Sequence, residues 1–186
     1  MPTVSNVSTG KPKVAGAVFR APLGTTLPTD ASTALGTAFV ELGYVSEDGV
    51  TNNNTPDSDT VQAWGGATVL VIQNEMSDEW TLTLIESLNP NVLKAVYGDS
   101  KVTVNSEAGT ITVQATAEQR LDACYVIDMS LKGGALKRVV IPSGSMSELG
   151  EIVYKDDEPI GYELTINALP DASGVQHYEY IKLVTT

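Results

Sequence analysis

Alternating apolar and polar residues predict a chain built mainly of strands. The clearest alternation runs from Gly161 to Ala168, where Tyr162, Leu164 and Ile166 alternate with Glu163, Thr165 and Asn167. Similar short runs, separated by Gly, Pro, Asn and Asp, recur along the sequence. They predict strands at 14–19, 37–44, 67–72, 79–86, 101–105, 110–115, 122–131, 136–141, 146–154, 161–168 and 178–184. The pattern predicts a mainly β fold, a β-sandwich or barrel of about ten strands.

One short helix is predicted between Asn89 and Gly98. Asn89 is a favourable N-cap, and Pro90 suits the first helical position because its missing N–H is not needed there. Val92 and Val96 lie on one apolar side, and Gly98 ends the helix. A helix of this length depends on packing against the sheet.

Two largely polar segments have no alternation and no local core to hold them. Residues 1–13 are predicted to form an extended N-terminal arm, and residues 46–63 a long loop of the single domain at 14–186. Long loops in compact domains are usually functional or disordered. This one lacks His, Cys and Lys, so we expect it to reach a neighbouring copy of the protein, through Glu47, Asp48, Asn52, Asn53, Asn54, Asp57 and Asp59.

Composition narrows the possible functions. The 186 residues carry a formal net charge of −12, which argues against ordinary nucleic-acid binding, because such binding needs Lys and Arg to neutralise phosphates. The single cysteine, Cys124, lies in an apolar run and is predicted to be a buried hydrophobic residue. The N-terminus lacks the apolar region of a signal peptide, and no apolar run of about 20 residues occurs, so we expect synthesis in a cytoplasm.

Candidate catalytic or metal-binding groups are few. His177 is the only histidine and lies beside a loop, so an exposed or half-buried structural residue is expected. Asp57 and Asp59 could supply oxygen ligands to Ca²⁺, but their spacing does not match an EF-hand, and a solvated loop is favoured. We therefore expect no catalytic residue and no cofactor.

Polar faces of the predicted strands suggest a second kind of surface. The outward residues of three strands are acidic or hydroxylic and include no Lys or Arg. These faces are either an ordinary solvent-exposed side of a sandwich or the lining of a water-filled channel. The candidates for a channel lining are Glu79, Thr81, Thr83, Asp122, Asp128, Ser130, Glu163, Thr165 and Asn167.

Three phrases in the N-terminal 100 residues or so carry a family resemblance. They are VAGAVFRAPLGTTLPTD, FVELGYVSEDGV and DTVQAWGG, in that order. The sequence resembles the major tail tube proteins of long, non-contractile-tailed bacteriophages (siphoviruses). The resemblance implies a subunit of the virion that forms hexameric rings, stacked into a tube through which double-stranded DNA passes without specific binding. It also implies a tape-measure protein and a tail terminator as partners, and no catalytic residues.

Within that resemblance, the 46–63 loop is interpreted as an arm between rings and the polar strand faces as the lumen. Two alternatives remain: a monomeric Ig-like β-sandwich that binds a ligand or mediates adhesion, and an acidic β-sandwich hydrolase. The hydrolase would need a deep pocket with perturbed carboxylates. Self-assembly distinguishes the tube protein from both.

Overall fold

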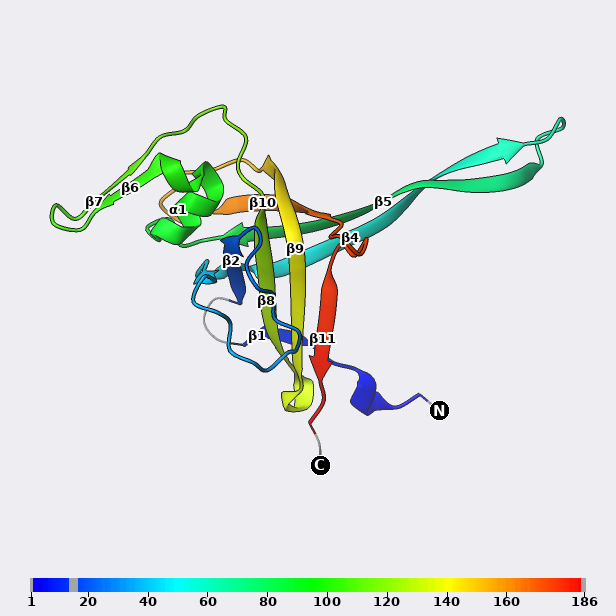
Figure 1. Ribbon diagram of the computed structural model, residues 1–186, viewed down its shortest axis with the longest axis horizontal. Coiled ribbons are helices and arrows are strands. Elements are labelled where there is room, and N and C mark those ends of the chain that lie inside the picture. Colours follow the sequence, from blue (N-terminus) through cyan, green and yellow to red (C-terminus); the bar gives the residue numbers. More distant parts are fainter. Residues whose placement is uncertain (1, 14–16, 185–186) are drawn as a thin grey trace.

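The computed structural model describes residues 2–13 and 17–184, and these are mainly β (Figure 1). One α-helix, α1 (Pro90–Tyr97), and three 3₁₀ turns, η1 (Val4–Asn6), η2 (Asp99–Lys101) and η3 (Lys132–Gly134), accompany the strands. The strands are β1 (Gly10–Pro12), β2 (Val18–Pro22), β3 (Val40–Glu41), β4 (Val45–Gln62), β5 (Thr68–Leu84), β6 (Val102–Asn105), β7 (Thr110–Val113), β8 (Ala123–Leu131), β9 (Leu136–Leu149), β10 (Tyr162–Leu169) and β11 (Tyr178–Lys182). The predicted mainly β fold with one short helix is confirmed.

Nine of the strands form one antiparallel sheet in the order β3-β2-β8-β9-β10-β5-β4, with β1 beside β8 and β11 beside β9. The two end strands, β3 and β4, are joined by only Leu42–Tyr44, so the sheet curls until its ends approach each other. Gly43, at φ 70°, lets this link pass close to Glu86, whose carboxylate accepts the Tyr44 N–H at 2.9 Å. No ladder joins β3 to β4 within the described residues, so the sheet is not a closed barrel.

The main core lies between one face of this sheet and α1. Buried residues of β5, β8, β9 and β10 pack there with Val92, Leu93 and Val96 of the helix. The helix begins as predicted, because the Asn89 side chain accepts the Asn91 N–H at 2.9 Å. It ends at Gly98, whose φ of 102° an L-residue rarely adopts.

A smaller core lies on the opposite face of the sheet. The segment between β2 and β3 crosses β2, β8 and β9 there and covers Cys124, Val126 and Val140. Cys124 is buried, as its apolar surroundings predicted. This segment covers only part of the face, and the part formed by β10, β5 and β4 is left open.

The predicted loop at 46–63 is wrong, because these residues form most of strand β4. They pair with β5 in a long hairpin that projects from the body (Figure 1). The chain reverses at the tip, where Gly65 and Gly66 have φ of 107° and 89°, and the two strands predicted separately at 67–72 and 79–86 form one continuous strand, β5. Asn, Asp and Pro56 are typical of loops, but an edge strand tolerates them because one side of its backbone needs no partner.

Other strand boundaries also differ from the sequence pattern. The predicted strand at 37–44 is reduced to the two residues of β3, and the one at 146–154 ends at Leu149. Pro142 does not break β9, because it lies at a register shift where β9 bulges opposite Cys124. The predicted strand at 14–19 begins outside the described residues, and its described part belongs to β2. The N-terminal arm is not fully extended along residues 2–13, because it contains η1 and then pairs as β1 with β8.

Replacing Gly144 should destabilise the fold. A Cβ at this position would lie 2.8 Å from the Tyr125 ring and 2.7 Å from Ile166 Cγ2, both within the main core. Gly144→Ala is expected to lower the free energy of unfolding by about 1–3 kcal/mol through overpacking, measured by urea denaturation. Gly36→Ala is the control, because nothing lies within 4 Å of its added Cβ. Equal midpoints for the two variants would contradict this packing.

Candidate functional site

The outer part of the β4–β5 hairpin exposes an uninterrupted run of apolar residues. Val69, Leu70, Val71 and Ile72 are successive residues of β5, all exposed, and Trp64 at the tip is fully exposed. Because successive strand residues point to opposite faces, both faces of the hairpin are apolar here. A two-stranded hairpin on its own is marginally stable in water. This surface is therefore suited to contact with another molecule.

All charged residues of the hairpin are acidic. The sequence contains no Lys or Arg between Arg20 and Lys94. All seven residues predicted for contact between copies lie on β4, with Glu47 and Asp48 near its start and Asp57 and Asp59 on the projecting part. The structure thus brings them together on one strand.

The base of the hairpin is anchored by a polar cluster that sequence reasoning missed. The buried Asp78 carboxylate accepts Asn52 Nδ2 at 2.6 Å and lies 2.5 Å from His177 Nδ1. The His177 ring also packs edge-on against Trp80, with ring centroids 5.2 Å apart. His177 is half-buried, as predicted, and joins the C-terminal part of the chain to the hairpin. Asn52 is used in this anchor rather than left free for a partner.

Six of the nine predicted channel-lining residues gather on one surface. Glu163, Thr165 and Asn167 of β10 lie directly opposite Thr83, Thr81 and Glu79 of β5. On the next strand on one side, β4, Thr51 and Asn53 pair with Thr81 and Glu79. On the next strand on the other side, β9, Glu148 and Ser145 pair with Thr165 and Asn167. This surface, named here the polar face, is the uncovered part of the sheet opposite the main core. Its ten residues include no Lys or Arg.

The remaining three predicted residues do not belong to the polar face. Asp122 is half-buried just before β8, and Ser130 lies near the far end of β8. Asp128 is 5% exposed and ion-paired, so its assignment to a channel lining is wrong. The alternation of β8 places it on the correct side of the sheet, but the segment between β2 and β3 covers it.

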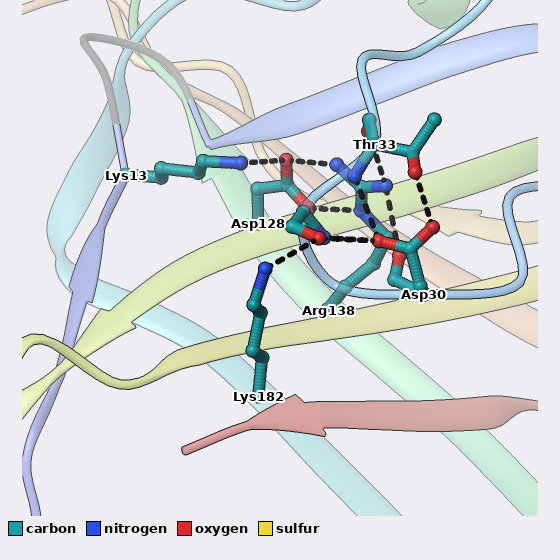
Figure 2. Close-up of polar contacts among 7 residues, drawn as sticks. Lys13, Asp30, Thr33, Asp128, Arg138 and Lys182 are labelled. Carbon is teal, nitrogen blue, oxygen red and sulfur yellow. Dashed lines mark hydrogen bonds and ion pairs between the residues drawn. The ribbon is translucent and has the colours of Figure 1, made fainter. Parts of the chain in front are cut away.

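Asp128 is instead part of a buried clamp centred on Arg138 (Figure 2). Arg138 donates to both Asp128 oxygens, from Nε at 2.6 Å and from Nη2 at 2.7 Å, and its other terminal nitrogen reaches the carbonyls of Asp30 and Thr33 at 2.9 Å. Lys13 approaches Asp128 at 3.6 Å, so the N-terminal arm also meets this pair. A buried ion pair needs such additional hydrogen bonds to offset its desolvation.

The segment held by the clamp is also fixed locally. The Asp30 carboxylate accepts the Ser32 and Thr33 N–H groups and both hydroxyls. These hydrogen bonds hold the pKa of Asp30 well below its usual value. From the C-terminal strand, Lys182 Nζ donates to Ser32 Oγ at 3.1 Å.

A sequence signal for the Arg138–Asp128 pair did exist. Both are charged residues at positions within apolar strands, and they lie equally far from Gly133 in the turn between β8 and β9. In an antiparallel hairpin, residues equally spaced from the turn lie opposite each other.

Fold and surfaces together define an antiparallel β subunit with a projecting, acidic and apolar hairpin. A protein-family model described as "Phage tail tube protein" matches residues 13–184, nearly the whole chain. The chain therefore belongs to this family and is a structural protein of the bacteriophage tail tube, which places it in the virion. A search of curated proteins finds no significant match. No helix among the described residues is long and apolar enough to span a membrane.

Removing the Arg138 side chain should strongly destabilise the subunit. Arg138→Met leaves the buried Asp128 carboxylate without its main partner and is expected to cost about 3–5 kcal/mol in the free energy of unfolding. Asp128→Leu combined with Arg138→Met should recover part of this loss, because no buried charge is left unpaired. Urea denaturation of the two variants and the parent protein measures both effects. A single variant as stable as the parent would contradict the clamp.

Proposed function

We propose that this chain self-assembles into hexameric rings that stack into the tube of a long, non-contractile tail. The observation that carries this proposal is the projecting hairpin, whose apolar residues cannot be buried within one copy. Rotational symmetry closes a ring, and contacts between different surfaces of successive rings extend the tube. Hexamers, the siphovirus tail type, synthesis in the host cytoplasm, and the tape-measure and terminator partners follow from the sequence resemblance.

The hairpin is proposed as the arm between rings. Its length carries its tip away from the body, and the Asp78–His177 anchor fixes its direction at the base. In this role residues 45–84 bridge to a neighbouring copy.

The polar face is proposed as the wall of the lumen. Its exposed surface carries carboxylates and hydroxyls without Lys or Arg, so it would repel DNA phosphates or leave them unbound. This repulsion acts only near the wall, because the Debye length is about 8 Å at physiological salt. DNA would thus pass through without specific binding during ejection.

Assembly of the purified protein should be visible directly. Negative-stain electron microscopy, with light scattering over a range of concentrations, is expected to show hollow tubes or stacked rings with six-fold end views. Rings of another symmetry would contradict the proposed hexamer but not self-assembly. A monomer at every concentration would contradict self-assembly by this chain and favour the monomeric binding module.

A cysteine on the polar face should report whether it lines the bore. Cys124 is buried, so Glu163→Cys adds one accessible thiol to the molecule. In dispersed subunits this thiol should react with both a small maleimide and one carried on a bulky polymer. In tubes it should react only with the small one, because the polymer cannot enter the lumen. Equal labelling of tubes by both reagents would place Glu163 outside the bore.

A further inference from the structure

The outer part of the hairpin combines an exposed apolar surface with carboxylates that have no basic residue nearby in the sequence. Residues 55–77, named here the distal hairpin, include the exposed run 69–72 and three carboxylates, those of Asp57, Asp59 and Glu75. Asp57 and Glu75 are directly opposite each other across the two strands. Like charges in this position are destabilising, so cations from a partner would relieve the hairpin of this repulsion.

A complementary surface exists at the end of the body that is drawn lowest in Figure 1, away from the side where the hairpin leaves. There η3 joins β8 to β9, and the described parts of both termini lie beside it (Figure 1). Lys11 of β1 pairs with Ser130, Ser130 pairs with Leu136, and Leu136 pairs with Lys182 of β11, so the two lysines lie in one cross-strand row. Lys132 lies in the adjacent turn, where its N–H donates to Ser8 Oγ at 2.8 Å. We name residues 2–12, 132–134 and 181–184 the lysine end.

The lysine end is apolar as well as basic. Its exposed hydrophobic residues are Val4, Val7, Ile181, Leu183 and Val184. Its neighbouring acids are already engaged: Asp128 with Arg138, Glu179 with Lys137 at 2.7 Å, and Asp30 with its own turn. Lys11, Lys132 and Lys182 are exposed, and their positive charge is not balanced by these acids.

Other exposed apolar residues lack this combination. Leu88, Leu121 and Tyr154 are at least as exposed as most of the lysine end. Each has an acidic residue within two positions, namely Glu86, Asp122 and Asp156. Arg120 adjoins Leu121 and Lys155 adjoins Tyr154, but each is a single cation near an acid, and none of these sites has three lysines as the lysine end does.

We propose that the distal hairpin of one copy docks on the lysine end of a second copy. The run 69–72 packs against the apolar residues of the end, and the hairpin carboxylates pair with Lys11, Lys132 and Lys182. The two surfaces are different, so the contact leaves a free hairpin and a free end and propagates from copy to copy. This proposal rests on the proposed function and names the surface that receives the arm.

Charge reversal on each surface tests the contact. One variant carries Asp57→Lys and Glu75→Lys, and the other carries Lys132→Glu and Lys182→Glu. Each alone should fail to form tubes or need a concentration at least about tenfold higher, as a loss of about 1.4 kcal/mol per contact gives. Mixed together, the two variants should assemble, because each hairpin then meets an end of opposite charge. Pelleting and electron microscopy measure assembly.

The mixture also separates a lost contact from a lost fold, since a misfolded variant would not be rescued by its counterpart. Matched controls are Glu107→Lys, an exposed acid on the β6–β7 hairpin, and Lys155→Glu, an exposed lysine outside the lysine end. Both controls should assemble like the parent protein.

A shortened hairpin distinguishes this proposal from the proposed function. In that variant, the dipeptide Asn-Gly replaces residues 55–77. It connects Asn54 to Asp78, which face each other across the hairpin, and Asn-Gly suits a two-residue hairpin turn. If the shortened protein fails to assemble while both charge variants assemble normally, the hairpin is an arm but docks elsewhere, and this proposal is overturned. If the shortened protein forms normal tubes, the arm itself is refuted. Failure of the variant mixture to assemble also overturns the proposal.

Discussion

A strand pair that leaves the body of the protein has no core of its own, and this constraint shapes the rest of the molecule. Only the inner part of β5 buries side chains, through Trp80, Leu82 and Leu84. Between Met76 and the tip, the two strands pair only with each other among the described residues, and apolar residues are exposed on both faces. Cross-strand hydrogen bonds cannot offset such exposure in a single copy. The completed structure is therefore larger than one chain, as membership of the tail tube family requires.

The body is built to hold such a hairpin rigidly. The curled sheet and α1 enclose the main core, and β5 runs from that core directly into the projection. Asp78, Asn52 and His177 fix the point of departure, with the buried carboxylate joining a strand to the C-terminal part of the chain. On the opposite side, Arg138 ties the covering segment to β8, while Lys13 and Lys182 connect both termini to the same region. One network thus positions the end of the body that we propose as the receiving surface.

The sequence predicted elements correctly where a local pattern, such as strand alternation or a helix cap, determines the structure directly. The alternation of Tyr162, Leu164 and Ile166 placed β10, and Asn89 with Gly98 bounded the helix. It also found six residues of the polar face, because alternation on β5 and β10 determines which side chains share a side. It failed for β4, whose Asn and Asp residues follow no alternation because neither of its outer faces is buried. It failed again for Asp128, since which part of a sheet face is covered depends on a distant segment. Pairings such as Asp78 with His177 join residues too far apart in sequence for a local pattern to reveal.

If the hairpin is an arm, a second copy covers the distal hairpin in the assembled tube. Hydrogen–deuterium exchange, compared between dispersed subunits and assembled tubes, tests this most directly, because weakly held strands exchange quickly until a partner protects them. We expect rapid exchange of the amides of 69–72 and 181–184 in the dispersed subunit, and strong protection of both segments in tubes. Rapid exchange of 69–72 within intact tubes would contradict this role of the hairpin.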